Sequence, residues 1–357
     1  MSIVTKTEPG DLPFVSVVMP VLNEAEFIKR SLGAIAQQTY PKGKMEVIVA
    51  DGMSTDETRS LITEIAANTT LEISIVDNPN KIAPTGLNCA FARAKGEIIV
   101  RVDGHCEIEP QYVANCVSHL TAGKAEGVGG PIETIGEGIQ AKAIALAMSS
   151  GFGVGGSAFR TVSDREMYTD TVAFPGYTRE IIEKAGPFNE ELVRNQDDEY
   201  NYRIRKLGGR ILLSPDIRSR YYSRSTFRSL WRQYFQYGYW KVRVFQIHPA
   251  QMSIRQFVPL AFVLSLILGT ILIFVPAIGI WPLAALSALY LIANVSAALS
   301  IGRQHLTLIP PLMLSFAILH LSYGSGFLYG LFAFAGTWLR PKTVNAIQAD
   351  GKTRFNP

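Results

Sequence analysis

Two long stretches without a charged side chain constrain the fold of this 357-residue chain more than any other feature. Residues 256–302 and 306–339 contain no Asp, Glu, Lys or Arg. A bilayer span needs about 20 apolar residues, so the first stretch predicts two membrane spans and the second predicts one long span or two short ones. Buried helices of a water-soluble core are the alternative, but such helices are rarely this long without a charge.

The number of spans decides on which side of the membrane the C-terminal tail lies. Three spans would place the tail outside, yet it carries basic residues typical of the cytoplasmic side, namely Arg340, Lys342, Lys352 and Arg354. A split of 306–339 near Gly324-Ser325-Gly326 would give four spans and remove this conflict. A re-entrant segment at Pro310-Pro311 would remove it equally well. The sequence therefore leaves both three and four helices open for this region.

Positive charge gathers just before the first apolar stretch. From residue 216 to residue 255 Asp216 is the single acid, whereas the basic side chains are Arg218, Arg220, Arg224, Arg228, Arg232, Lys241, Arg243 and Arg255. Such charge beside a first span marks the cytoplasmic side. Met1–Pro13 contains no apolar leader segment, so residues 1–255 are expected in the cytoplasm. A nucleic-acid patch is the alternative, but the adjoining spans favour a membrane interface and no nucleic-acid partner.

Residues 226–245 predict an amphipathic helix. Its stripe at helical spacing consists of Phe227, Leu230, Trp231, Tyr234, Gly238 and Lys241, and Arg228, Arg232 and Arg243 lie outside that stripe. A helix of this kind lies in the interfacial plane of a bilayer. It would either present another part of the chain to the membrane surface or only anchor the chain.

The first part of the chain alternates between strand and helix patterns. Apolar runs predict strands at 15–19, 45–50, 71–76 and 97–102, and helices are expected at 24–38, 54–67 and 84–94, with another after Pro110. Asn23 and the capping box Ser54-x-x-Glu57 are expected to begin the first two helices. This alternation predicts a parallel sheet with right-handed crossovers.

Polar side chains follow three of these strands. Asp103-Gly104-His105 ends the fourth strand, where a carboxylate and an imidazole two residues apart can both face a divalent ion held by a substrate phosphate. Asp51 ends the second strand, and its carboxylate can accept the imide hydrogen of uracil. The alternative is that Asp51 and the residues after it only form a turn and cap the next helix. Asn23 and Glu24 follow the first strand and can bond a ribose or a base edge. The carboxyl edge of an open α/β sheet is where ligands bind.

A second acidic cluster, Asp197-Asp198-Glu199, lies at the expected start of a later helix. Adjacent acids repel one another, which can raise the proton affinity of one of them toward that of a general base. The alternative is a solvated acidic first turn, which the helix dipole favours.

The glycines of Gly151-x-Gly153-x-x-Gly156 fit the dinucleotide-binding fingerprint only formally. That fingerprint must follow the first strand and open a helix, and neither is predicted here. The segment is interpreted as a flexible loop near an acceptor or as an ordinary surface loop.

Together and in this order, these segments resemble the family 2 glycosyltransferases with the GT-A fold. Pro20-x-x-Asn23-Glu24, Asp51-Gly52-x-Ser54-x-Asp56 and Asp103-x-His105 are similar to the nucleotide-binding half of the family. The segment from Gly186-Pro187-Phe188 to Asp197 and Arg203 is similar to the one that carries its catalytic base. Three further runs resemble the membrane-bound ExoA-type enzymes of succinoglycan and other exopolysaccharide biosynthesis, namely residues 101–106, 152–157 and 195–199.

The resemblance implies an α/β fold of the GT-A type, with a Rossmann-like and mostly parallel sheet. It implies an N-terminal tail at 1–13, a catalytic domain at 14–222, an amphipathic interfacial segment at 223–255, a transmembrane region at 256–339 and a C-terminal tail at 340–357. The implied location is the cell inner membrane, crossed several times, with the catalytic domain in the cytoplasm. The sequence carries no signal for a particular oligomeric state.

The implied reaction is the inverting transfer of a hexose, such as glucose, from a UDP-sugar to a saccharide linked to polyprenyl diphosphate. Asp197 would be the base because of its six-residue offset from Arg203, and Asp198 competes because the Glu-Asp pair of the family reads Gln196-Asp197 here. Asp103 and His105 would hold manganese or magnesium, although the family motif usually ends in Asp. The residues expected at the nucleotide-sugar are Pro20, Asn23, Glu24, Asp51, Lys81, Asp103 and Arg179, where Lys81 and Arg179 are alternatively solvated surface residues.

Three other functions compete with this one. A processive polysaccharide synthase would need more spans and a Gln-x-x-Arg-Trp motif, whose nearest match is Gln236-x-x-Tyr239-Trp240. A transferase with a sugar-phosphate lipid as donor would leave the nucleotide-binding segments without a purpose. A non-enzymatic membrane scaffold predicts damaged acidic positions, yet Asp51, Asp103 and Asp197 are all present.

Overall fold

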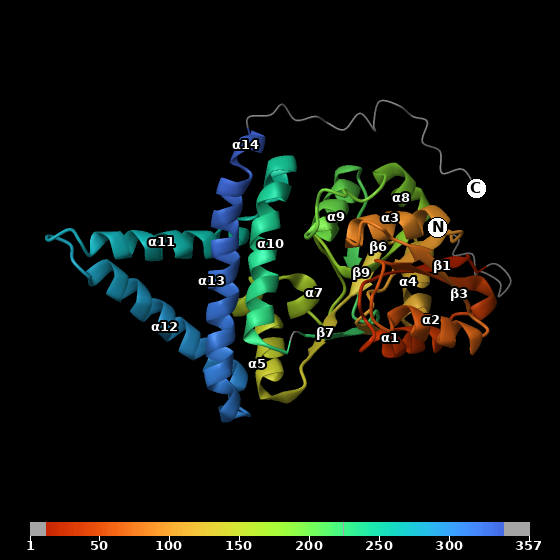
Figure 1. Cartoon of the computed structure of the whole chain (residues 1–357), viewed down its shortest axis with the longest axis horizontal. Helices are drawn as coiled ribbons and strands as arrows, with labels where there is room; N and C mark the ends of the chain where they lie inside the picture. The colour runs from red at the N-terminus through yellow and green to blue at the C-terminus, as the bar shows by residue number, and fades with distance from the viewer. Residues whose placement is uncertain (1–11, 224, 339–357) are drawn as a thin grey trace, which may run out of the picture. The chain divides into compact units, whose positions relative to one another are not determined.

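The computed structural model describes residues 12–223 and 225–338 (Figure 1). The chain divides into two units. The first comprises the described residues up to Glu133 together with Ala158–Tyr221, and the second comprises Thr134–Ser157 together with the described residues from Tyr222 onward. Most of the tail 1–13, Arg224 and the C-terminal tail 340–357 lie outside the described residues, and with that tail the four basic residues used to orient the spans.

An eight-stranded sheet forms the centre of the first unit, in the order β3-β2-β1-β4-β9-β6-β10-β8. Its strands are β1 (Val15–Val21), β2 (Met45–Asp51), β3 (Glu72–Asp77), β4 (Ile98–Arg101), β6 (Gly127–Gly130), β8 (Met167–Tyr168), β9 (Ala173–Thr178) and β10 (Ile211–Leu213). β1 pairs in parallel with β2 and β4, β2 with β3, and β6 with β10. β9 runs antiparallel between β4 and β6, and β8 runs antiparallel to β10. The predicted mostly parallel α/β sheet is confirmed.

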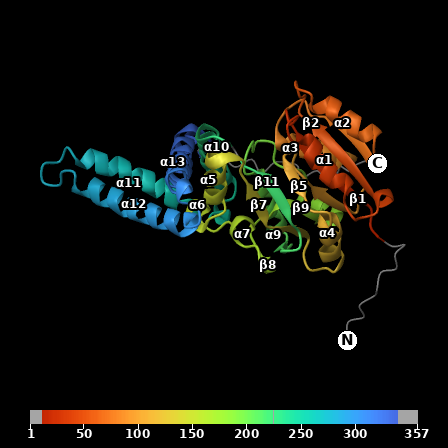
Figure 2. The same cartoon turned by 90° about the horizontal axis from the view of Figure 1, so that it is seen from below.

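Helices connect the strands and cover both faces of this sheet. They are α1 (Ile28–Ala36), α2 (Thr58–Ala67), α3 (Ala83–Arg93), α4 (Tyr112–Thr121), α7 (Ala158–Thr161), α8 (Arg179–Ala185) and α9 (Gln196–Lys206). Figures 1 and 2 show α1 and α2 on one face of the sheet and α3 on the other. β2 is buried along its whole length because both of its faces are covered, which explains its apolar run. A smaller sheet has the order β5 (Cys106–Ile108), β11 (Ser219–Tyr222) and β7 (Ile132–Ile135).

The two predicted helix caps are wrong. Asn23 does not cap α1, because its backbone is left-handed with φ of 54° and its Oδ1 accepts a hydrogen bond from the Thr55 N–H. The expected capping box is also absent from this described segment, since Glu57 itself is the N-cap residue of α2 and the Ser54 hydroxyl donates to Asp51 at 2.6 Å. Both polar side chains make contacts between or within loops, and these contacts replace local capping.

The glycine-rich segment is more ordered than the predicted loop. Residues Gly151–Val154 form α6, whose start is capped by the Ser150 hydroxyl accepting from the Gly153 N–H. Gly155 and Gly156 then have φ values of 63° and 77°, a left-handed conformation that favours glycine. The segment is therefore a short helix followed by a glycine turn.

The second unit is helical. Its elements are α5 (Gly138–Met148), α6, α10 (Phe227–Ile247), α11 (Val258–Leu272), α12 (Trp281–Gly302), α13 (Ile309–Ala333) and α14 (Ala335–Trp338), with 3-10 turns at Pro249–Gln251, Ile254–Gln256 and Leu306–Leu308. By length and composition, two of the described helical segments could cross a membrane, Trp281–Gly302 and Leu306–Ala333. α11 has 15 residues and is shorter than the span predicted there. α11 and α12 lie side by side, with Gly269 close to Leu283 (Figure 2).

The proposed split of the last apolar stretch is wrong. α13 continues without a break through Gly324-Ser325-Gly326. Pro310 and Pro311 occupy its first turn, where the missing N–H of proline costs no helical hydrogen bond, so they begin α13. A re-entrant segment at this position stays a prediction.

The predicted amphipathic helix exists as α10, but its stripe is not free to lie on a lipid surface. Leu230, Tyr234, Gly238 and Lys241 are all buried, whereas Trp231 remains 41% exposed. A Cβ atom at Gly238 would lie 2.0 Å from the Tyr323 carbonyl oxygen of α13, so the two helix backbones touch there. Part of the stripe that was predicted to face the membrane interface is therefore apolar because it is buried between helices.

Close backbone contact between α10 and α13 leads to a first prediction. Gly238→Ala should lower the free energy of unfolding of the second unit by about 1–3 kcal/mol, because the added methyl overpacks a helix contact that has no room for it. Gly151→Ala is the matched control in the same unit, since nothing lies within 4 Å of a Cβ at that glycine. Urea unfolding of the detergent-solubilised protein, followed by tryptophan fluorescence, measures both. Equal midpoints for Gly238→Ala and the parent would contradict the close contact.

Candidate functional site

The carboxyl ends of β2, β1 and β4 lie next to one another in the sheet, and they bring the predicted strand-end residues to one edge. Val21 is in register with Asp51, and Val18 is in register with Arg101. Asp103 follows β4 after one intervening residue, Val102. A Cβ added at Gly104 would lie 2.9 Å from Glu24 Cγ, so the segments after β1 and β4 are in contact. The edge is the expected place for a ligand in a sheet of this type.

Asp51 is fully buried and already has polar partners. Its Oδ1 accepts from the Ser54 hydroxyl at 2.6 Å, and its Oδ2 lies 3.1 Å from Arg59 Nη1. The same guanidinium reaches Asp77, the last residue of β3, at 2.6 Å. Arg59 and Asp77 were missed in the sequence, where the signal was only an acid at the end of the third strand. Their pairing holds the turn after β2 against β3.

Asn23 and Glu24 form the loop after β1. The Glu24 carboxylate is 2.9 Å from His105 Nδ1, and the Glu24 N–H donates to the Thr58 hydroxyl at 2.8 Å. The Asn23 N–H donates to the Ser54 hydroxyl at 2.9 Å. Pro20 lies within β1 itself, only partly buried. These contacts join the loops after β1, β2 and β4 into one network at the sheet edge.

Arg101 is the centre of the charged part of the site. Its guanidinium, with 6% of the side chain exposed, donates to both carboxylate oxygens of Asp103, at 2.8 and 3.1 Å, and also to Asp197. Burial disfavours the charge on Arg101, but the attraction of Asp103 and Asp197 outweighs it and raises its pKa above the usual value. A single buried cation thus joins the acid after β4 to the acid at the start of α9.

Asp197 lies in the first turn of α9, after Asn195, which has a left-handed φ of 62°. Burial by the surrounding protein raises the pKa of Asp197; Arg101 opposes the shift, and the charges of Asp103 and Asp198 add to it. Its side chain remains 39% exposed, so a hydroxyl group can reach the carboxylate. A carboxylate with a raised pKa and solvent access has the properties of a general base.

Glu199, one of the three acids in the first turn of α9, has a different role from Asp197. Glu199 is buried and pairs with Arg203 at 2.7 and 3.0 Å. Arg203 also donates to the carbonyl oxygens of Ala185 and Pro187, in the segment before α9. This ion pair fixes the loop that presents Asp197.

The strand-end acids fit a metal only if a substrate supplies further ligands. The side chains of Asp103 and His105 are 20% and 24% exposed. Within residues 12–223 and 225–338 no three His, Cys, Asp or Glu side chains are grouped closely enough to hold an ion. A carboxylate and an imidazole suit manganese or magnesium when phosphate oxygens and water complete the coordination.

Two predicted contacts with the donor have different positions. Lys81 is exposed in the turn before α3, with a left-handed φ of 61°. The Arg179 guanidinium donates to the carbonyl oxygens of Gly96 and Ala94 at 2.8 and 2.6 Å. Its N–H donates to Glu97, which precedes β4, whereas Asp103 follows β4. Arg179 therefore lies at the amino end of β4, away from the strand ends that carry Asp51 and Asp103. There its guanidinium closes the turn between α3 and β4.

Part of the chain matches a known protein family, and most of it is similar to individual known proteins. Residues 16–186 match the family "Glycosyl transferase family 2". The chain is 29% identical over 313 residues to the succinoglycan biosynthesis protein ExoA of Rhizobium meliloti (strain 1021), covering 87% of this chain and 93% of that protein. It is 29% identical over 272 residues to the dolichyl N-acetyl-alpha-D-glucosaminyl phosphate 3-beta-D-2,3-diacetamido-2,3-dideoxy-beta-D-glucuronosyltransferase of Methanococcus voltae, covering 73% of this chain and 84% of that protein.

Among solved structures, the mannosyltransferase PcManGT of Pyrobaculum calidifontis, in complex with GDP-Man and Mn2+, is similar with a TM-score of 0.57 and 20% identity. The similarity covers 89% of this chain and 87% of that one, and it shows a GT-A-like fold. These similarities support a family 2 glycosyltransferase that resembles ExoA.

Proposed function

We propose that the protein transfers a hexose from a UDP-sugar, with inversion at the anomeric carbon, to a saccharide carried on polyprenyl diphosphate. The observation that carries the proposal is the bridge that Arg101 makes between Asp103 and Asp197. An inverting transferase needs the leaving diphosphate and the incoming hydroxyl on opposite sides of one sugar carbon. Here Asp103 would lie near the diphosphate and Asp197 near the incoming hydroxyl, and Arg101 holds the two acids together.

The donor would lie at the carboxyl edge of the sheet. Asp51 would accept the imide hydrogen of uracil, and Asn23 and Glu24, with the end of β1 at Pro20, would border the ribose and base. Lys81, which is exposed in the turn before α3, would contact a phosphate of the donor. PcManGT, as its name states, was solved with a nucleotide-sugar and Mn2+, which supports this type of donor.

The proposed chemistry belongs mostly to the residues of this chain. Asp197 would take the proton from the acceptor hydroxyl, and Asp198 is its competitor for that role. Arg101 would hold Asp197 in position while the acceptor enters. Asp103 and His105 would hold manganese or magnesium, which when bound neutralises the developing charge of the diphosphate.

The acceptor and location rest on relatives and on composition. The name of the Methanococcus voltae relative describes transfer to a dolichyl-linked sugar phosphate, and ExoA is named for succinoglycan biosynthesis. Together with the apolar helices, this supports a lipid-linked acceptor and an enzyme that crosses the inner membrane several times. The catalytic domain, residues 14–222, would face the cytoplasm, followed by the interfacial segment 223–255 and the spans 256–339.

A donor screen tests the proposal. Purified full-length protein is incubated with manganese or magnesium, a polyprenyl-diphosphate saccharide and one of several UDP-sugars or GDP-mannose, and products are read by mass spectrometry. We expect a single added hexose with UDP-glucose or a related UDP-hexose. A ladder of repeated additions would instead indicate a processive synthase. No product with any donor, from protein that binds neither UDP nor GDP, would favour a scaffold.

A further inference from the structure

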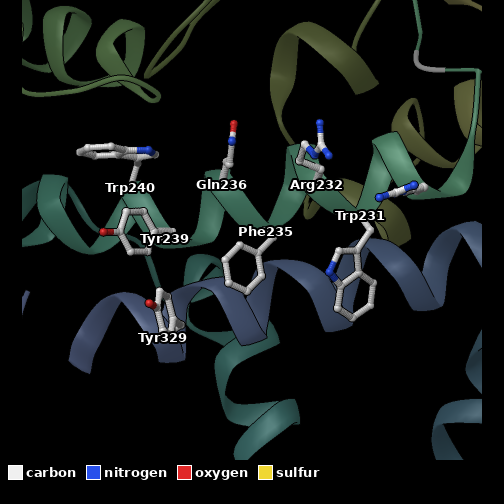
Figure 3. A pocket seen from close by; sticks show the side chains of 8 residues that line it. Trp231, Arg232, Phe235, Gln236, Tyr239, Trp240 and Tyr329 are labelled. Atoms are coloured by element: carbon white, nitrogen blue, oxygen red, sulfur yellow. The ribbon is translucent and has the colours of Figure 1, made fainter. Parts of the chain in front are cut away.

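An open groove lies along α10 and is completed by α13 (Figure 3). Its cavity volume is about 490 Å³. All of its lining residues belong to the second unit and none takes part in the site described above. The groove therefore needs its own explanation.

The lining residues of α10 form two rows with a spacing of four residues, which places each row on one side of the helix. Figure 3 shows Arg232 and Trp240 on one side of α10, and Trp231, Phe235 and Tyr239 extending toward α13. One row therefore supplies the charge, and the other supplies a continuous aromatic wall.

The cationic end of the groove lacks a counter-ion among the described residues. Arg228 and Arg232 are exposed, and neither makes an ion pair or hydrogen bond with any residue of the described ranges. The sequence from residue 217 to residue 255 contains no acid at all. Two neighbouring guanidinium groups of this kind bind phosphate oxygens with several N–H donors at once.

The aromatic end is exposed although its rings are ordered against one another. The rings of Tyr239 and Tyr329 stack with centroids 5.8 Å apart, and Phe235 lies 6.0 Å from Tyr329. Tyr329 is 58% exposed, and Trp231, in the helical turn of the two arginines, is 41% exposed. Exposed aromatic surface of this extent, next to an open cavity, is typical of a binding site for an apolar group.

The groove is also preformed. A Cβ atom at Gly326 of α13 would lie 2.0 Å from the Phe235 carbonyl oxygen, and one at Gly330 would lie 2.8 Å from the Tyr239 carbonyl oxygen. The helix backbones thus touch directly behind the aromatic wall and hold its rings in place. A site that needs little ordering on binding keeps more of its contact energy as affinity.

We propose that this groove binds the phosphate-bearing head and the first isoprene units of a polyprenyl lipid. The proposal rests on the proposed function, which requires a lipid-linked acceptor, and it names where that lipid is held. The charge at Arg228 and Arg232 matches a phosphate, and the wall from Phe235 to Tyr329 matches a chain of flat double bonds that pack on aromatic faces. From Arg228 to Tyr239 the helix rises about 16 Å, at 1.5 Å for each residue, which suits an amphiphile with its anion at one end.

Lipid binding is tested with the full-length protein in nanodiscs, titrated with polyprenyl phosphate or with dioctadecyl phosphate, which has the same type of head and saturated chains. We expect the parent to prefer the polyprenyl lipid by about tenfold, and Tyr329→Ala to abolish that preference. The double variant Arg228→Gln, Arg232→Gln should weaken binding of both lipids by about tenfold or more. Arg303→Gln is the matched control, an exposed arginine of the same unit outside the groove.

Several outcomes would overturn the proposal. Equal affinity of the parent for the two lipids would make the groove a general site for anionic lipids. Unchanged polyprenyl binding in the arginine double variant would place the lipid elsewhere. Circular dichroism checks that each variant is folded.

The failure of this proposal can be told apart from failure of the proposed function. Transfer to a short water-soluble acceptor should be unchanged in the groove variants, while transfer to the polyprenyl acceptor falls. If the parent binds polyprenyl phosphate as expected but transfers no sugar from any donor, the groove stands and the proposed function does not.

Discussion

Asp197→Asn is expected to lower sugar transfer by about 100- to 10,000-fold while UDP binding remains close to that of the parent. The substitution keeps the shape of the side chain and an oxygen that can accept from Arg101, but it replaces the carboxylate by a neutral amide that is too weak a base to take the proton of the acceptor hydroxyl. Initial rates at saturating donor, together with calorimetric titration of UDP, measure the two effects separately. Loss of rate with unchanged UDP affinity is the signature of a base that acts on the acceptor side.

Asp198→Asn is the matched comparison, because it removes the neighbouring charge in the same helical turn. We expect it to retain far more activity than Asp197→Asn, since the described contact with Arg101 is made by Asp197. If Asp198→Asn loses transfer and Asp197→Asn keeps it, the assignment of the base is shifted by one residue. Equal and small losses in both variants would mean that neither acid is the base.

The second large effect is expected for Asp103→Asn. This variant should bind UDP about 100-fold more weakly in the presence of manganese and should lose most of the stimulation by the metal, because the bridging ion would lose its carboxylate ligand. UDP titrations with manganese and with a chelator measure the metal-dependent part of the affinity directly.

His105→Asp is the comparison for this prediction, since it restores the ligand type that is usual in the family. It should keep metal-dependent UDP binding, although it loses the contact with Glu24. If Asp103→Asn keeps full manganese stimulation, the role of Asp103 is to pair with Arg101, and the metal is held without it.

Much of the catalytic fold could be predicted because apolar runs and turns are local signals. The strand that ends near Asp51 and the one before Asp103 were predicted within a residue or two, as was the start of α3 at Pro84. The position of β9 between β4 and β6 could not be predicted, since periodicity does not identify which strands are neighbours.

The errors at the site come from side chains with two possible uses. Asn23 and Ser54 are residue types that often cap helices. In the fold their side chains instead form hydrogen bonds between the loops after β1 and β2 and with Asp51. Arg179 was expected at the donor. Because β9 runs antiparallel to β4, its last residues lie beside the amino end of β4, and this strand direction could not be predicted from the sequence. Arg101 had a visible signal that was not used, a lone charge within the run Ile98–Val102.

The contact between Arg101 and Asp197 has a consequence for how the protein folds. It joins residues that are 96 positions apart in the sequence. The entropy of closing a long loop must be overcome before such a contact contributes, so distant pairings tend to form late. Until α9 docks, Arg101 is a cation held in the apolar strand β4 with Asp103 as its nearby acid. The reactive centre should therefore be completed only by a late folding step, and a nascent chain that ends before residue 197 should have an assembled nucleotide edge but no base.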